Sequence, residues 1–237
     1  MFLAALQEPE PVHYLPIATT VISAVFATVL FRRLVRKGGG APHLLWWGLG
    51  VVFFGLGTAL ESCITLFGNS PLLNKLWYVA GALFGAWPLA QGTVYLLLRR
   101  STADTLTRIV LPLTSILALV VLLSPIDPAL LEAHRPGGAA LEWSWVRLFT
   151  PFINLYAAVF LIGGAAWSSW RYARRREFPG LAAGNALIAT GAILPGIGGG
   201  MAKAGMVEAL YVGEFVGILL IWAGYGLCTR PSGPAGA

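Results

Sequence analysis

The chain has 237 residues, of which 57% are hydrophobic and only 11% are charged, and its mean hydropathy is +0.74. Because a soluble domain usually carries about 25% charged residues, this composition excludes an ordinary soluble protein and indicates a membrane protein. The two cysteines form no CxxC pair and no cluster with histidine, so the sequence predicts neither a zinc site nor a disulfide framework.

A membrane-spanning helix needs about 20 mostly apolar residues, and seven such runs follow one another along the chain. We expect spans at 15–31, 44–66, 76–98, 107–124, 148–170, 180–200 and 206–228. The predicted fold is an all-α, seven-transmembrane-helix bundle, a single domain over residues 1–228 with a short cytoplasmic tail at 229–237. Acidic residues precede the first apolar run and arginines follow it, so we expect a retained span rather than a cleavable signal.

Basic residues alternate between the two sides of this predicted bundle. One set of connections holds twelve of the 16 lysines and arginines, and the opposite set holds Lys75, Arg135, Arg147 and Lys203. By the positive-inside rule, the N-terminus lies outside and the C-terminus lies in the cytoplasm. The net charge of +6 is thus a topology signal, which favours anionic inner-leaflet lipids as partners and argues against nucleic acid. We expect a plasma-membrane protein, with a bacterial inner membrane as its location.

Weak internal similarity links the two ends of the chain. The stretch "WYVAGALFGAWP" (77–88) resembles "LYVGEFVGILLIW" (210–222), and the first and fifth spans both end in arginine clusters. This similarity predicts a 3+1+3 repeat, in which the first three spans correspond to the last three and the fourth span connects them. Parallel repeats of this kind build several small transporter folds. We expect the glycine pairs at 81/85, 180/184 and 213/217 to be packing surfaces between helices, and the pairs at 81/85 and 213/217 are also candidates for contact with a partner protein or a second copy. The glycine-rich stretch 196–205 is interpreted as a helix break and outer loop.

Three polar residues interrupt the outer halves of different spans: Glu61, Asn154 and Glu214. With a rise of 1.5 Å per residue they lie about 8, 10 and 12 Å below the outer boundary. An ionised side chain inside a bilayer costs several kcal/mol, so such residues usually have a function. We therefore expect an outer-half pocket for a small or lipid-like ligand, lined by these three residues and Tyr211.

Two alternatives stay open for each acid. A neutral glutamic acid can simply hydrogen-bond a neighbouring helix and hold the bundle together, whereas an ionised one needs a cation, and two lysines lie near the outer helix ends. The long outer connection 124–147 is expected to cover the pocket. Secondary candidates for the pocket, or for a polar path beneath it, are Thr58, Ser62, Lys75, Gln91 and Lys203.

Signatures of intramembrane enzymes are absent from the sequence. It has no HExxH and no GxSxG motif, and no aspartate lies within a predicted span. His13 and His134 lie outside and His43 inside, so the three histidines do not form one metal site under this topology. We favour a protein without enzymatic activity, assign no catalytic residue, and expect neither a cofactor nor a metal.

One stretch, "ESCITLFGNSPLLNKLWYVAGALFGAWP" (61–88), resembles the seven-span sensor regions found at the N-terminus of some bacterial histidine kinases. Those regions carry a Glu late in one span, a short outer loop, and then Lys, an aromatic pair, Gly and Pro. The matching residues here are Glu61, Lys75, Trp77, Tyr78, Gly81 and Pro88. The resemblance implies an outward-facing sensor or binding module, and because no kinase domain follows residue 228, a stand-alone one.

Three functions are consistent with these patterns. The first is a stand-alone sensor or binding module with the outer-half pocket. The second is a small proton- or cation-coupled transporter of 3+1+3 build that uses the same acids. The third is a structural subunit of a larger membrane complex, docked through its glycine faces.

Overall fold

The structure is a computed structural model, and it describes residues 11–175 and 178–230. Within these ranges the chain forms helices and no strand, apart from one isolated bridge between Ile126 and Leu141. The all-α prediction is confirmed.

Six helical stretches of the described ranges are long and apolar enough to cross a membrane. A short turn, η1 (Pro11–Tyr14), leads into the first, and the fourth joins η5 (Ser144–Leu148), α6 (Thr150–Ala157), η6 (Ala158–Gly163) and α7 (Gly164–Arg175). The other five are α1 (Leu15–Arg36), α2 (Pro42–Phe67), α5 (Arg100–Leu123), α8 (Pro179–Lys203) and α9 (Val207–Thr229). The chain is therefore a multi-pass membrane protein by length and composition of its helices.

The expected third span is not one continuous helix. It consists of α3 (Pro71–Trp77), a π-helical segment η2 (Tyr78–Leu83), a bend at 84–86 and α4 (Trp87–Leu97). The bend is tight, because a Cβ placed on Gly85 would lie 2.3 Å from the carbonyl oxygen of Gly81. Pro88 lies in the first turn of α4, where its missing N–H costs no intrahelical hydrogen bond. Whether these pieces make a seventh crossing stays a prediction.

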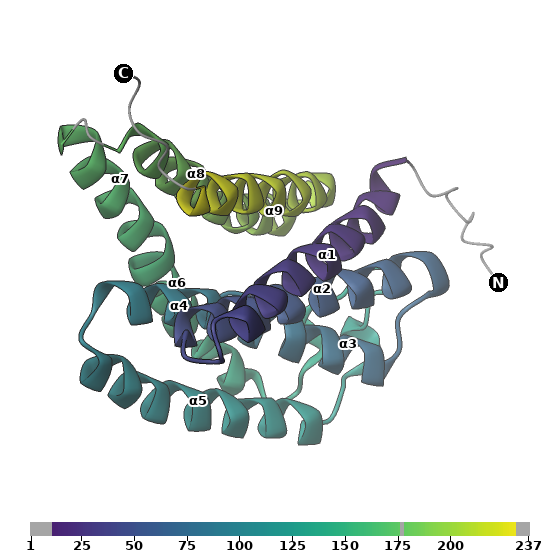
Figure 1. Cartoon of the computed structure of the whole chain (residues 1–237). Coiled ribbons are helices and arrows are strands. Elements are labelled where there is room, and N and C mark those ends of the chain that lie inside the picture. The colour runs from purple at the N-terminus through teal and green to yellow at the C-terminus, as the bar shows by residue number, and fades with distance from the viewer. Residues whose placement is uncertain (1–10, 176–177, 231–237) are drawn as a thin grey trace.

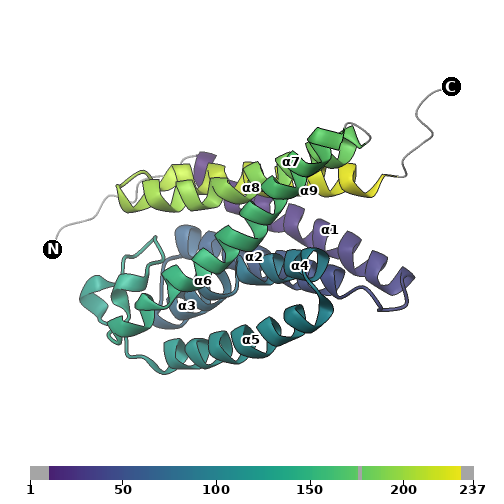
Figure 2. The ribbon, with the colours of Figure 1, turned by 90° about the vertical axis from the view of Figure 1, so that its left-hand side faces the viewer.

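The helices are arranged around α2 and α4. The pair α8 and α9 lies side by side on one side of the molecule, α5 lies on the opposite side, and α2 and α4 lie between them (Figure 1). The segment α6–α7 runs diagonally from the lower part up to the α8–α9 pair (Figure 2). Aromatic and aliphatic side chains fill two buried clusters, one around Phe26, Trp47 and Ile218 and one around Trp87 and Leu141.

The expected helix break at 196–205 is wrong for most of its length, because α8 continues to Lys203 and the chain turns only at Ala204–Gly205. The glycines serve helix contact instead. A Cβ on Gly198 would lie 2.6 Å from the carbonyl oxygen of Ala209, and one on Gly191 would lie 2.5 Å from that of Gly217. Glycine lets two backbones approach closely in lipid, and here it joins α8 to α9.

The glycine pairs expected to dock a partner or a second copy are used inside the chain. Gly213 and Gly217 face Leu194, Gly191 and Pro195 of α8. Gly81 packs on Gly57 of α2, and Gly85 is buried at the bend. The four glycines are thus packing surfaces within the chain, as the sequence predicts, and docking of a partner or a second copy stays a prediction. The 3+1+3 repeat stays a prediction.

Candidate functional site

Two carboxyl groups from distant parts of the sequence meet in the interior of the helix bundle. Glu61 of α2 is 2% exposed and Glu214 of α9 is half-buried, and their side chains lie within hydrogen-bonding reach of each other. The expected proximity of Glu61 to Glu214 is therefore present. We call these two residues the acid pair.

Small residues explain why the two helices turn these faces to each other. On α9, Gly213 and Gly217 contact α8, so Tyr211 and Glu214 lie on a different face of the helix. On α2, Gly57 contacts the backbone of Gly81, and Thr58 and Glu61 follow on the side toward the bundle interior. The sequence thus uses glycine on one face of each helix to orient the acid on another.

A contact between two carboxyl groups requires a proton. Two ionised carboxylates would repel each other, whereas one shared proton turns the contact into a hydrogen bond. The Oε2 atom of Glu214 is buried and has no conventional donor among the described residues. A proton held between Glu61 and Glu214 would let the two carboxyl groups hydrogen-bond each other.

Hydroxyl side chains lie within about one helical turn of each acid along α2 and α9. Tyr211, 1% exposed, shares a hydrogen bond of 3.1 Å with Thr65, and Thr58 shares one of 2.9 Å with Thr20 of α1. Ser62 donates to the carbonyl oxygen of Thr58 at 2.9 Å. Both acids lie close enough to Tyr211 to act electrostatically on its hydroxyl. We define the outer polar cluster as Thr20, Thr58, Glu61, Ser62, Thr65, Tyr211 and Glu214.

The long connection after α5 lies over this cluster, as the sequence predicts. Nδ1 of His134 lies 3.1 Å from the carbonyl oxygen of Thr65, and Arg135 donates to the carbonyl oxygen of Ala202 on α8 at 2.6 Å. The amide of Asn69 holds the connection from below by donating to the carbonyl oxygens of Glu132 and Arg135, at 3.0 and 3.1 Å. The connection is thereby fixed to the outer ends of α2 and α8.

The outer polar cluster has an apolar floor. Toward the expected inner side, the same helices contribute Phe26, Leu30, Val51, Ile218 and Ile221, all of them buried. These side chains carry no group that can relay a proton or coordinate an ion. Between them and the cluster lies Ser23 of α1, which is buried against Gly55 of α2. Buried apolar side chains thus separate the acid pair from the predicted inner side.

Asn154 is not part of the cluster, and its assignment to the pocket is wrong. It is exposed on α6, whereas its neighbour Ile153 is buried. Depth along a helix, which placed Asn154 level with the acids, does not determine the direction in which a side chain points. Asn154 therefore matches the acids in depth along its helix but lies on the outward face of α6.

The secondary candidates divide between the cluster and other parts of the fold. Thr58 and Ser62 belong to the cluster, but Lys75 donates to the carbonyl oxygen of Leu122 at 3.0 Å and so ties α3 to the end of α5. The side chain of Lys203 lies outside the described part of the structure. A lysine partner for the acid pair, one of the alternatives above, is therefore not found in Lys75.

Gln91 belongs to a separate buried network. Its amide nitrogen donates to the carbonyl oxygen of Ala103 at 3.0 Å and to Thr107 at 2.8 Å, and Tyr156 donates to its amide oxygen. This network joins α4, α5 and α6 and satisfies a fully buried side chain. It holds helices together and is no continuation of the outer polar cluster.

Sequence reasoning missed Thr20, which contributes a hydroxyl from α1. Its signal was present, since "TTVIS" (19–23) places three hydroxyl side chains on an otherwise apolar span. His13 was placed outside, but its position against the Tyr211 ring, with centroids 6.1 Å apart, was not foreseen. Both residues lie on segments whose rotation about the helix axis the sequence does not specify.

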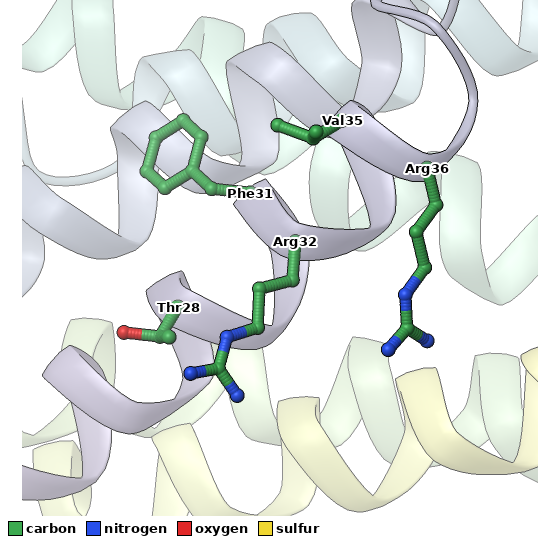
Figure 3. A pocket seen from close by; sticks show the side chains of 5 residues that line it. All are labelled: Thr28, Phe31, Arg32, Val35 and Arg36. Atoms are coloured by element: carbon green, nitrogen blue, oxygen red, sulfur yellow. The ribbon is translucent and has the colours of Figure 1, made fainter.

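The described residues contain no group of three His, Cys, Asp or Glu side chains that could hold a metal ion. Two shallow grooves lie away from the acid pair, one on α1 and one on α9. The first is lined by Thr28, Phe31, Arg32, Val35 and Arg36 (Figure 3). Neither groove includes a residue of the acid pair.

Neither family models nor curated proteins give a match to this chain. The resemblance of residues 61–88 to the sensor regions of histidine kinases therefore stays an expectation from the sequence. The functional argument rests on the geometry of the acid pair and its surroundings.

Proposed function

We propose that this multi-pass membrane protein is a sensor or binding module of the bacterial plasma membrane. Its ligand is a small or lipid-like molecule that enters from the outer side and contacts Glu61 and Glu214. Tyr211 and the hydroxyl groups of the outer polar cluster complete the site.

The contact between the two buried carboxyl groups is the observation that carries the proposal. Each acid inside a membrane is costly, and structural hydrogen bonding is served as well by Ser, Thr or Asn at lower cost. Two carboxyl groups that share a single proton carry one net negative charge, and both become acceptors for a ligand once that proton is lost. Such a pair favours a ligand group that brings positive charge or hydrogen-bond donors, such as an ammonium group.

The apolar floor favours binding over transport. A transporter has to pass its substrate or coupling ion through the bundle, and polar groups normally continue along that path. Here one hydroxyl, that of Ser23, continues from the cluster, and the buried side chains of Phe26, Leu30 and Val51 follow on the inner side. The docking role through glycine faces has less support, because Gly213 and Gly217 are covered by α8.

A thermal-unfolding experiment with n-butylammonium as the probe tests the proposal. Protein in lipid nanodiscs is heated with n-butylammonium chloride or with sodium chloride at the same ionic strength. A ligand that binds only the folded state raises the unfolding temperature as its concentration passes its dissociation constant. We expect the ammonium-specific rise in the wild type and its loss in the double variant Glu61→Gln/Glu214→Gln.

Glu208 provides the matched control. It lies in the first turn of α9, on the same helix as Glu214, but it is exposed. Glu208→Gln should respond to the probe like the wild type. An equal response of all three proteins, or none in the wild type, contradicts the proposed site. Uptake of the probe into protein-containing vesicles, abolished by Glu61→Gln/Glu214→Gln, would favour the transporter instead.

A further inference from the structure

Helix α7 presents aromatic and cationic side chains on one exposed face. Trp167, Trp170, Arg171 and Arg174 follow each other at spacings of three, one and three residues, so they form a single stripe along the helix. All four are exposed, and Arg175 lies beside the stripe and is exposed too. This stripe, Trp167–Trp170–Arg171–Arg174, has no part in the outer site described above.

Three side chains of the stripe are ordered by contacts with each other, and the fourth, Arg171, lies 5.9 Å from the centre of the Tyr172 ring. The rings of Trp167 and Trp170 lie 4.9 Å apart at an angle of 34°, and the guanidinium of Arg174 lies 4.1 Å from the centre of the Trp170 ring. Stacking of this kind holds an arginine in place while leaving its N–H groups free to bind an acceptor. A ligand then meets a preformed surface.

The opposite face of α7 is fixed to the protein. Ser169 donates to the carbonyl oxygen of Ala182 on α8 at 2.8 Å. The start of the helix, before the stripe begins, is also packed, because a Cβ on Gly164 would lie 2.7 Å from Leu97 and 3.1 Å from Thr93. The stripe therefore points away from the bundle, and α7 leads toward the end of the α8–α9 pair (Figure 2).

The stripe carries uncompensated positive charge within the described part of the chain. Ion pairs among residues 11–175 and 178–230 join Arg100 to Asp104 and Arg135 to Glu132, and none involves the arginines of α7. Indole rings prefer the headgroup level of a membrane, and arginine binds phosphate with two parallel hydrogen bonds. The position of the stripe at the arginine-rich end of its span corresponds to the predicted cytoplasmic boundary.

We propose that the stripe is a discrete binding site for the phosphate headgroup of an anionic phospholipid in the cytoplasmic leaflet. Arg171 and Arg174 contact the phosphate, and Trp167 and Trp170 lie against the glycerol and upper acyl region. This goes beyond a general attraction of the basic inner face to anionic lipid, because it assigns the lipid to one helix. It does not depend on the function proposed for the acid pair.

The α1 groove of Figure 3 provides a matched comparison. Arg32 and Arg36 are exposed arginines one turn apart at the same predicted membrane boundary, but no tryptophan lines that groove. Removal of two charges there changes the net charge by the same amount as removal of Arg171 and Arg174. A difference between the two double variants therefore reports on the site and not on the total charge.

Native mass spectrometry of the detergent-solubilised protein, titrated with phosphatidylglycerol, tests the site. We expect one tightly held phosphatidylglycerol in the wild type and in Arg32→Gln/Arg36→Gln. A surface arginine contributes about fivefold to the attraction of anionic lipid, so Arg171→Gln/Arg174→Gln should raise the half-saturating concentration about 30-fold. Phosphatidylcholine and glycerol 3-phosphate, titrated alone, should bind weakly to all three proteins.

Three results would overturn the assignment. Equal weakening in both double variants would indicate diffuse surface charge. Unchanged lipid binding in Arg171→Gln/Arg174→Gln would show that the stripe does not bind the lipid and would indicate another partner, such as an acidic protein. Tight binding of glycerol 3-phosphate alone would show that a soluble phosphate suffices, without a lipid. Trp167→Phe/Trp170→Phe tests the aromatic part and should weaken phosphatidylglycerol binding while the protein stays folded.

Discussion

Replacement of the acid pair by leucines gives the sharpest energetic test of the Glu61–Glu214 contact. Glu61→Leu leaves the carboxyl of Glu214 buried without its partner, and Glu214→Leu does the same to Glu61. The double variant removes both polar groups at once. Leucine is close to glutamic acid in size, so the surrounding helices keep most of their packing.

The expected free energies follow from burial and hydrogen bonding. A buried polar group that loses its partner costs about 1–3 kcal/mol, and each single variant should lose that much free energy of unfolding. Removal of both partners in favour of apolar groups is often nearly neutral. The double variant should therefore be more stable than the sum of the two single effects predicts, with a coupling energy of at least about 1 kcal/mol.

Reversible unfolding in mixed micelles of mild detergent and dodecyl sulfate measures these free energies. Glu208→Leu, on the exposed first turn of α9, controls for the loss of a carboxylate and should change stability by about 0.5 kcal/mol or less. Additive effects of Glu61→Leu and Glu214→Leu, within about 0.5 kcal/mol, would refute the contact, because residues that do not touch behave independently.

Three further predictions concern packing, the inner network and topology. Gly224→Ala places a methyl group 2.4 Å from the carbonyl oxygen of Gly184 and should lower the free energy of unfolding by about 1–3 kcal/mol. Gly226→Ala has nothing within 4 Å of its new methyl group and should raise the free energy of unfolding by up to about 1 kcal/mol. Equal effects of the two variants in the same micelle assay would contradict the close α8–α9 contact. Tyr156→Phe removes the donor to Gln91 and should cost about 1 kcal/mol, while Tyr172→Phe leaves stability unchanged; no difference between the two would exclude the network. In a background without Cys63 and Cys228, a membrane-impermeant maleimide should label Ala133→Cys in whole cells and spare Ala173→Cys, and the reverse pattern would invert the topology.

Composition and periodicity predicted most of the helices, because lipid imposes a length of about 20 apolar residues on every crossing. Five of the expected spans correspond to α1, α2, α5, α8 and α9 with ends shifted by a few residues. The interruption between α3 and α4 was harder to foresee. It depends on Gly85 folding back on Gly81 and on the contact of Gly81 with Gly57, which are tertiary contacts between residues of the same apolar character.

The acid pair was predictable and Asn154 was not, for one geometric reason. Depth follows from counting residues along a helix, and it placed both glutamates at similar levels. The direction of a side chain depends on how each helix is rotated. In α2 and α9, glycines fix that rotation through backbone contacts. The α6 helix instead lies between the short helix η5 and the π-helical η6, which change the number of residues per turn, and its Asn154 faces outward.

Labelling of the acids from the membrane phase tests the central claim most directly. Dicyclohexylcarbodiimide is apolar and reacts with protonated carboxyl groups, so it should modify Glu61 or Glu214 in native membranes and leave the exposed Glu208 largely unmodified. Peptide mass spectrometry then compares the labelling rates with and without n-butylammonium in the outer solution. The account predicts that n-butylammonium slows labelling of the acid pair several-fold. Labelling of Glu61 and Glu214 at the same rate with and without the probe would contradict a ligand site at the acid pair.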